Sequence, residues 1–305
     1  MKKLTMLIVA TIFTVILSAC SMESPFLQNE EGSTGQDTLK IGFSISTLNN
    51  PFFVTLSEGA KANATELGSE IVIVDAQDDA SKQASDVEDL IQQGVDLILI
   101  NPVDSAAVGS AVQSANTAGI PVITVDRSAD QGEVVSHIAS DNVAGGALAG
   151  EYLLELAGEG AKVAMLEGVA GSSAARDRGD GFLSAVEGKV DLVSSLTANF
   201  DRGEGLTVME NMLQANPEIK AVFAQNDEMA LGALEAIKAS GKDIIVIGFD
   251  ATDDALAKIK EGKMAASVAQ KPEEIGKAAI ETAVNYLNGE TVEEFVPVDL
   301  ELVKQ

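Results

Sequence analysis

The sequence has no tryptophan, one cysteine and one histidine among its 305 residues. Because Cys20 is alone, no disulfide can form within the chain. One cysteine and His137 do not suffice for a zinc cluster, and the surroundings of His137 do not support a Ser-His-Asp triad. His137 fits a structural role instead, or a position between two parts of the fold. Aromatic residues make up 4% of the chain and hydrophobic residues 46%, so we expect an aliphatic core.

Basic residues are also scarce. The chain carries 20 Lys and Arg against 47 Asp and Glu, a formal net charge of −27 at pH 7. A surface this negative repels phosphate, so nucleic acids and anionic lipid headgroups are poor candidate partners. The acidic residues are scattered, which is typical of a solvated surface. Residues 75–81 lack the glycine of an EF-hand, and the glycine-rich segment GVAGSSAARDRGDGF lacks the GK[ST] ending of a phosphate-binding loop.

The first 20 residues have the pattern of a secretory signal. Lys2 and Lys3 precede an apolar run over residues 4–17, which is too short for a comfortable membrane span, and small residues follow it. The sequence LSAC, which ends at Cys20, resembles the lipobox of bacterial lipoproteins, in which the cysteine becomes the lipidated N-terminus. We therefore predict a signal peptide over 1–19 and a lipidated Cys20 at the start of a flexible tether over 20–37. This predicts an extracytoplasmic protein anchored to the cell membrane, in the periplasm or on the outer face of the plasma membrane.

From residue 39 onward, short apolar runs alternate with helical patterns. Uninterrupted runs such as LILI at 97–100 are typical of strands buried on both faces of a parallel sheet, and the helices between them indicate right-handed βαβ units. Residues 134–139 look like an edge strand that leads into a second series of units, and a last short strand is expected at 295–298. One sheet holding all these strands would exceed the usual size. We therefore predict an α/β fold of two Rossmann-like lobes with parallel sheets.

The stretch IGFSISTLNNPFF, residues 41–53, changes from strand to helix. Asn50 is a good N-cap and Pro51 suits the first helical position, which places Phe52 and Phe53 at the carboxyl end of a strand. In open parallel sheets, small ligands bind at that edge. An amide beside flat aromatic rings suits a sugar, although two phenylalanines that simply close a core would give the same pattern.

Polar side chains also follow several later strands. The chain places such groups at the carboxyl ends of strands in both series, namely Asn50, Asp126 and Arg127 in the first and Asn226, Asp250 and Gln270 in the second. Any one of them could be a turn residue or a cap. Six at equivalent edges predict a cleft between the lobes, where carboxylates accept and the guanidinium donates hydrogen bonds to a small polyol.

Arg176 and Arg178 begin a predicted helix, where positive charge opposes the helix dipole. Arginines in this unfavourable place suggest a functional partner that compensates for the helix dipole. A surface salt bridge is the simpler explanation.

Eight motifs together resemble one known family. They are STLNNPFF, INPVDSAAVGSAV, IPVITVDR, GEVVSHIASDN, AGSSAARDRGDGF, FDRGEGL, AVFAQNDEMALGAL and VIGFD. They are similar to the motifs of periplasmic D-ribose-binding proteins, the solute receptors of ribose ABC importers, from about residue 39 to the end. The resemblance implies the periplasmic-binding-protein type I fold, with a first lobe of 38–140 plus 271–299 and a second of 141–270 plus 300–305. It also implies a hinge near residues 140–141, 270–271 and 299–300.

The resemblance further implies a sugar site without a cofactor or metal. The positions that match the family's ribose-binding residues are Asn50, Phe52, Phe53, Asp126, Arg127, Arg178, Phe200, Asn226, Asp250 and Gln270. D-ribose would be held in the interlobe cleft by hinge closure and delivered to the membrane permease of an ABC transporter. The protein would be a monomer. The lipobox and the acidic surface depart from the family pattern, so docking to a chemoreceptor stays open.

Three alternatives remain at this stage. The first keeps the class but changes the ligand to allose, galactose, another pentose or a furanose signal. The second is a sugar-active enzyme that uses Asp126 and Asp250 as a carboxylate pair, although both lie beside hydrogen-bond donors typical of ligand binding. The third is the effector core of a lactose-repressor-type regulator, against which the export signal and the acidic chain argue strongly.

Overall fold

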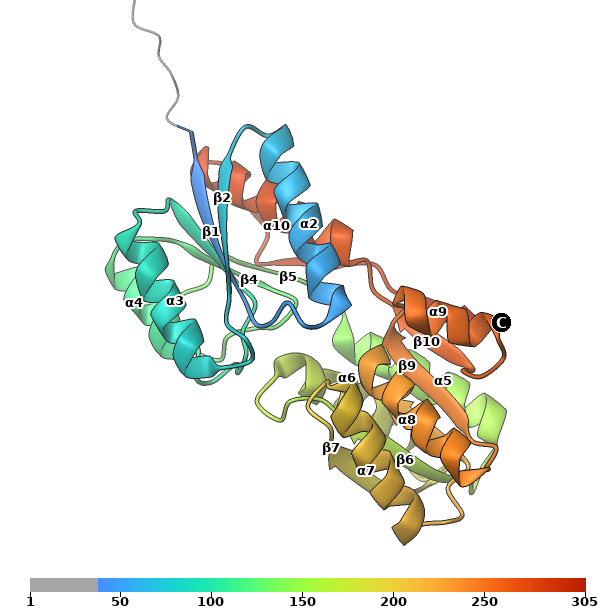
Figure 1. Cartoon of the computed structure of the whole chain (residues 1–305). Helices are drawn as coiled ribbons and strands as arrows, with labels where there is room; N and C mark the ends of the chain where they lie inside the picture. Colours follow the sequence, from blue (N-terminus) through green and yellow to red (C-terminus); the bar gives the residue numbers. More distant parts are fainter. Residues whose placement is uncertain (1–37) are drawn as a thin grey trace, which may run out of the picture. The chain divides into compact units, whose positions relative to one another are not determined.

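The computed structural model describes residues 38–305; the predicted signal peptide, Cys20 and the tether lie outside the described residues. The described part contains two six-stranded sheets, each with its helices, which we call the first and second lobes (Figure 1). The predicted α/β architecture of two parallel-sheet lobes is confirmed.

The first lobe has the strand order β11-β5-β4-β3-β1-β2, and all its strand pairs are parallel. Its elements are β1 (Lys40–Ile45), α2 (Pro51–Glu66), β2 (Glu70–Asp75), α3 (Ala80–Gln92), β3 (Leu97–Ile100), α4 (Gly109–Thr117), β4 (Val122–Val125), β5 (Ser136–Ser140), α10 (Pro272–Leu287) and β11 (Phe295–Val298).

The second lobe has the order β12-β10-β9-β8-β6-β7, in which only the β10–β12 pair is antiparallel. Its elements are α5 (Asn142–Ala157), β6 (Lys162–Glu167), α6 (Ser173–Val186), β7 (Asp191–Thr197), α7 (Arg202–Ala215), β8 (Ala221–Ala224), α8 (Asp227–Ser240), β9 (Ile245–Asp250), α9 (Asp253–Lys260), β10 (Ala266–Ala269) and β12 (Glu301–Lys304).

One sequence-based expectation about strands is wrong, and one strand was missed. The segment expected as an edge strand is β5, which lies between β4 and β11 rather than at the edge. The strand β12 was not predicted, because its sequence ELVK is short and polar at both ends. It returns the chain to the second sheet after β11 and covers β10.

The strands expected to be buried on both faces are buried. Every residue of β3, β4 and β8 is buried, because helices cover both sides of these central strands. The helix α10 comes from the far end of the chain but packs beside α2 (Figure 1). A Cβ on Gly276 would lie 2.8 Å from the backbone nitrogen of Ala60, so glycine permits this close approach.

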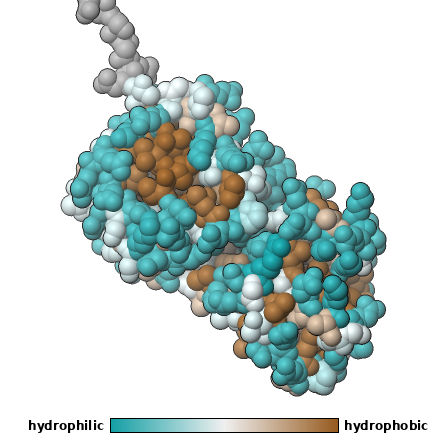
Figure 2. All heavy atoms as spheres, viewed as in Figure 1, coloured by the Kyte–Doolittle hydropathy of each residue, from teal (hydrophilic) through white to brown (hydrophobic). Residues whose placement is uncertain are grey.

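The visible surface is mainly hydrophilic, with a hydrophobic patch on the first lobe (Figure 2). On the face shown in Figure 2, hydrophilic residues cover most of both lobes. Across residues 38–305, no helix combines the length and the apolar character needed to cross a bilayer.

Candidate functional site

All ten residues singled out from the sequence line one cavity. Its empty volume is about 240 Å³, and Ala174 is an eleventh lining residue. The first lobe contributes the loop after β1, the start of α2 and the segment after β4, and the second contributes α6, the last residue of β9 and the segments after β7, β8 and β10. The carboxyl edges of the two sheets therefore meet around one space, as the sequence pattern predicts.

The loop after β1 supplies an aromatic corner. Asn50 caps α2, since its Oδ1 accepts a hydrogen bond from the backbone N–H of Phe52 at 2.9 Å, and Pro51 occupies the first turn. The rings of Phe52 and Phe53 meet edge to face with centroids 5.1 Å apart. Both rings also belong to the buried core of the first lobe. The two readings of this motif are therefore compatible, because the same rings close the core and line the cavity.

A third ring comes from the second lobe. Phe200 has a φ of 61°, in the left-handed region that a phenylalanine rarely adopts. Its ring lies against Gly168, where any Cβ would overlap it. The guanidinium of Arg127 lies 5.1 Å from the ring centre of Phe53 and 5.2 Å from that of Phe200, so one cation stacks on rings from both lobes.

Arg127 has unused hydrogen-bonding capacity. It is 4% exposed, and burial lowers the pKa of its guanidinium. Its Nη1 donates to the carbonyl of Pro102 at 3.1 Å, and its Nε lies 3.7 Å from Oδ2 of Asp126 without a hydrogen-bond partner. A buried N–H of this kind can donate to an acceptor that a ligand supplies.

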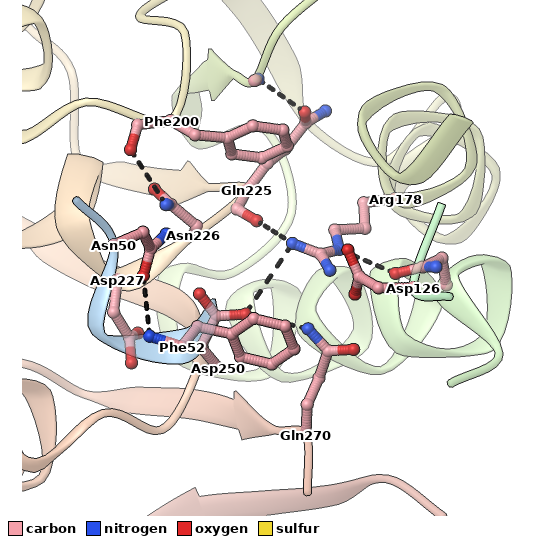
Figure 3. Close-up of polar contacts among 12 residues, drawn as sticks. Asn50, Phe52, Asp126, Arg178, Phe200, Gln225, Asn226, Asp227, Asp250 and Gln270 are labelled. Atoms are coloured by element: carbon pink, nitrogen blue, oxygen red, sulfur yellow. Dashed lines mark hydrogen bonds and ion pairs between the residues drawn. The ribbon is translucent and has the colours of Figure 1, made fainter. Parts of the chain in front are cut away.

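Arg178 is fixed more completely than Arg127. Its Nε donates to Oδ1 of Asn142 and its Nη1 to the carbonyl of Gln225, both at 2.8 Å. The guanidinium lies 3.9 Å from the ring centre of Phe249 and pairs with Asp250, with Nη1 and Oδ1 3.9 Å apart (Figure 3). Buried interactions thus offset the unfavourable helix dipole for this arginine.

Its neighbour Arg176 behaves differently. Arg176 forms a salt bridge with Asp130 of the first lobe at 2.9 Å, and both side chains are about 40% exposed. The simpler explanation, a surface salt bridge, therefore holds for Arg176, while Arg178 faces the cavity.

The two aspartates of the cavity share an unusual backbone. Asp126 follows β4 with a φ of 64°, and Asp250 ends β9 with a φ of 115°. L residues reach this region at a cost, which indicates that the surrounding contacts hold both turns. Nε2 of Gln270 donates to Oδ1 of Asp250 at 2.9 Å, and burial raises the pKa of the Asp250 carboxyl well above its usual value.

Three buried polar atoms of the cavity have no hydrogen-bond partner. They are Oδ1 of Asp126, Nε of Arg127 and Oε1 of Gln270. They comprise two acceptors and one donor, which is the combination that hydroxyl groups satisfy. Because unpaired buried polar atoms are costly, these three atoms fit a hydroxyl-rich ligand.

Asn226 plays a double role that resembles that of Asn50. Its Oδ1 caps α8 by accepting from the N–H of Met229 at 2.9 Å, and its Nδ2 donates to the carbonyl of Phe200 at 3.1 Å. The cap reading and the site reading are again compatible, because the capping contact directs the amide toward the aromatic wall.

Sequence reasoning missed the residues that support the cavity from behind. Asn142 and Gln225 hold Arg178, Asn101 lies behind Asp126, and Asp227 lies behind Asp250. Asn101 and Gln225 directly follow apolar strands, so their positions carried a signal. Asn142 carried no such signal, because it begins α5 and its contact with Arg178 depends on how α5 and α6 pack.

The lobes also touch beside the cavity. The N–H of Ser105 donates to the carbonyl of Gly171 at 2.9 Å, and the N–H of Ser173 donates to Oγ of Ser105 at 3.1 Å. The N–H of Ser128 donates to Oγ of Ser173 at 2.9 Å. We call Ser105, Ser128, Gly171 and Ser173 the closing contact. It joins the first lobe to the N-terminal end of α6, so the structure has the lobes in contact.

His137 lies outside the lining of the cavity. Among residues 38–305, no group of three His, Cys, Asp or Glu side chains is arranged to hold a metal ion. His137 stacks on Phe295 at 5.7 Å and shares a hydrogen bond with Oγ1 of Thr124, and burial lowers its pKa. Its contacts are thus structural ones inside the first lobe.

Comparison with known proteins places this geometry in a family. The model of the periplasmic binding protein domain matches residues 41–291. The ribose import binding protein of Bacillus subtilis (strain 168) is 54% identical over 298 residues, which is 98% of each chain. That of Escherichia coli (strain K12) is 51% identical over 305 residues, covering 99% of this chain and 98% of the relative.

A solved structure agrees with these relatives. An ABC transporter solute-binding protein from Mycobacterium smegmatis with bound glycerol superposes with a TM-score of 0.84 at 40% identity, covering 88% of this chain and 94% of that one. By matched length, identity and fold, the protein belongs to the periplasmic binding protein family.

Proposed function

We propose that this protein is the solute-binding component of a ribose ABC importer, and that it binds D-ribose in the cavity between its lobes. The relatives that support ribose are the ribose import binding proteins of Bacillus subtilis and Escherichia coli, which match nearly the full chain. All ten residues that the family resemblance assigns to the ligand line the one cavity. The family is one of binding proteins, which does not favour the enzyme alternative.

The single observation that carries the proposal is the set of buried unpartnered atoms on Asp126, Arg127 and Gln270. They face a cavity with three phenylalanine rings, so apolar faces and unsatisfied polar atoms occur together. A monosaccharide offers hydroxyls for the polar atoms and C–H faces for the rings. The carboxylate of Asp250 and the guanidinium of Arg178 add charge-assisted hydrogen bonds.

Binding would proceed by hinge closure. The cavity is built from both lobes, so a sugar makes its full set of contacts only when the lobes approach and exclude water. We propose that 38–140 plus 271–299 and 141–270 plus 300–305 move as two bodies about the three crossings. A micromolar dissociation constant corresponds to roughly −8 kcal/mol, which several charge-assisted hydrogen bonds and ring contacts can supply. The closed form is what the permease would recognise.

The test is titration calorimetry with ribose on three variants. Asp250→Ala and Arg178→Ala should each abolish measurable binding, because each leaves a buried charged or polar partner without its counterpart. Glu218→Ala, which removes an exposed charge paired only with Lys162, is the control and should bind like the wild type. Unchanged affinity in both pocket variants would reject the site, and a wild type that ignores ribose would reject the ligand. A panel of allose, galactose and the other pentoses then identifies the sugar.

We further propose that Cys20 is lipidated after signal cleavage and tethers the receptor to the membrane. The support is the LSAC sequence that follows the apolar run. Mass spectrometry of the membrane fraction should find an acylated N-terminal Cys20, and Cys20→Ser should release the protein from that fraction. An unmodified wild-type N-terminus would contradict the anchor but not the sugar site.

A further inference from the structure

Asp227 is a buried carboxylate that the binding scheme above does not use. It follows Asn226 directly and begins α8, but it does not line the cavity. Its side chain is fully buried. Burying a carboxylate is costly unless it is hydrogen bonded, so its contacts show what it stabilises.

Those contacts all lead to the turn after β9. Oδ2 of Asp227 accepts from the N–H of Thr252 at 2.7 Å and from its Oγ1 at 3.1 Å. Oδ1 accepts from Oγ of Ser267 in the neighbouring strand β10 at 2.7 Å. Oγ of Ser267 in turn accepts from the N–H of Ala251 at 2.9 Å. Two side chains thus hold two consecutive backbone N–H groups.

The turn that they hold has an unfavourable backbone. Asp250 has a φ of 115° and Ala251 a φ of 54°, and neither is glycine. Such a conformation persists only where surrounding contacts enforce it. Gly248 leaves space for this support, because any Cβ there would overlap Oδ1 of Asp227. The direction of the Asp250 side chain into the cavity follows from this turn (Figure 3).

The first lobe has a comparable arrangement with different chemistry. Asp126 has a φ of 64°, and Nδ2 of Asn101 behind it donates to the carbonyl of Val125 at 2.9 Å and to Oδ2 of Asp126 at 3.4 Å. Each pocket aspartate therefore has a buried polar side chain from the adjacent strand end behind its turn. In the first lobe that side chain is a neutral amide, and in the second it is a carboxylate.

We infer that Asp227 and Ser267 are positioning residues that set the direction of the Asp250 carboxylate, and thereby determine which sugar hydroxyl configuration the site accepts. This inference rests on the proposed function, because it assigns a specificity role at the same site. Neither residue touches the ligand. Removing either one should let the 250–252 turn relax, and Asp250 would then meet the sugar in the wrong place.

The test compares the pattern of affinities rather than one affinity. Ser267→Ala and Asp227→Asn are titrated in a calorimeter with ribose, 2-deoxyribose, arabinose, xylose and lyxose, beside Asp250→Asn and Asp126→Asn. Ribose affinity should fall by roughly 10-fold to 100-fold in Ser267→Ala, as expected when a hydrogen bond to a charged group is misplaced. The ranking of the five sugars in both positioning variants should follow that of Asp250→Asn, not that of Asp126→Asn.

A matched control separates positioning from general loss of packing. Ser136→Ala removes the same hydroxyl from an equally buried strand serine in the first lobe, where Oγ has no hydrogen-bond partner. It should leave both affinity and ranking unchanged. A uniform loss across all five sugars in Ser267→Ala, a ranking like that of Asp126→Asn, or wild-type behaviour would overturn the inference.

A ligand-free measurement keeps this test independent of the proposed function. Amide hydrogen exchange, followed by NMR on the sugar-free protein, should be faster at Ala251 and Thr252 in Ser267→Ala, while the amide of Asp126 keeps its wild-type protection. Unchanged exchange at Ala251 would refute the positioning role even if ribose binds. If instead the wild type binds none of the sugars, the proposed function fails while the exchange result still decides whether the turn is held.

Discussion

Gly171 of the second lobe offers a direct test of hinge closure, because its neighbours Asp104 and Ser105 belong to the first lobe and would move away if the lobes opened. A Cβ placed on Gly171 would overlap Oδ2 of Asp104 and lie 2.5 Å from its Cγ, whereas ordinary contact begins at 3.4 Å. If the Asp104 side chain keeps its position, relieving the contact with Cγ alone moves the two lobes apart by about 0.9 Å in Gly171→Ala (3.4 minus 2.5 Å). Gly171 itself lies outside the sugar cavity.

The size of the effect follows from the closing contact. The bond from the N–H of Ser105 to the carbonyl of Gly171 is 2.9 Å long, and that from Ser173 to Ser105 is 3.1 Å. A separation of nearly 1 Å takes both beyond hydrogen-bonding distance. At about 0.5 to 1.5 kcal/mol each, their loss disfavours the closed form by roughly 1 to 3 kcal/mol, which weakens sugar affinity about 5-fold to 150-fold.

The assay is ribose titration together with thermal unfolding of the sugar-free protein. We expect weaker binding in Gly171→Ala with little change in unfolding temperature, because the clash exists only when the lobes meet. Gly203→Ala is the control: it adds the same methyl to an exposed position of α7, away from the cavity. Wild-type affinity in Gly171→Ala would refute the reasoning that this contact belongs to the ligand-bound form.

A compensating variant makes the test stricter. Asp104 could instead turn aside, but its Oδ1 accepts from the N–H groups of Ala106 at 2.9 Å and Ala107 at 2.7 Å. Because the clash exists only in the closed form, turning Asp104 aside would cost about 0.5 to 2 kcal/mol on closure and would also weaken sugar affinity. The double variant Gly171→Ala with Asp104→Ala removes the clash, so it should recover most of the lost affinity. Failure to recover would show that the steric explanation is wrong.

Three further predictions concern charged groups. Burial raises the pKa of Asp227 from 3.8 to about 7, so between these pH values the folded state holds a proton that the unfolded state has released. The free energy of unfolding should therefore fall by up to about 4 kcal/mol because of this group as the pH rises from 4 to 7. Urea unfolding of Asp227→Asn should lack this part of the decrease. Arg127→Lys keeps the charge but cannot stack between two rings, so ribose affinity measured by calorimetry should fall about tenfold. Arg176→Gln removes an exposed pair and should change affinity less than about fivefold, whereas Arg178→Gln removes a buried one and should lower it more than about 100-fold; equal effects in the two titrations would contradict the assigned environments.

Much of the fold could be predicted because the signals were local. A run such as LILI in β3 is typical of a buried strand, and Asn50 before Pro51 favours a helix start through its side-chain cap and the fixed φ of proline. The position of β5 within its sheet could not be predicted in the same way. Its outer neighbour β11 lies more than 150 residues further along the chain, so no local pattern reports the pairing.

The sequence predicts the site residues that lie at strand ends, but it does not reveal residues whose role depends on contacts between distant segments. Asp250 ends β9 and Gln270 follows β10, so topology alone brings them to one edge of the sheet. Gly171 and Ser105 have no such pattern, because their contact depends on how the two lobes meet. The sequence gives no sign of a role for Asp227, and only the three-dimensional contacts show that its carboxyl group holds the turn after β9.

In each lobe a buried amide side chain holds a loop of the site in place, which affects how much free energy binding costs. Oδ1 of Asn101, after β3, accepts from the N–H of Ser46 at 3.1 Å, and Oε1 of Gln225, after β8, accepts from the N–H of Gly168 at 2.8 Å. Asn101 fixes the loop after β1 and Gln225 fixes the loop after β6, and those loops carry or support the phenylalanine walls. Each half of the site is therefore ordered within its own lobe before a sugar arrives. Ligand binding then costs mainly the approach of two ordered halves rather than the ordering of loops, which is why the closing contact should have a measurable effect on affinity.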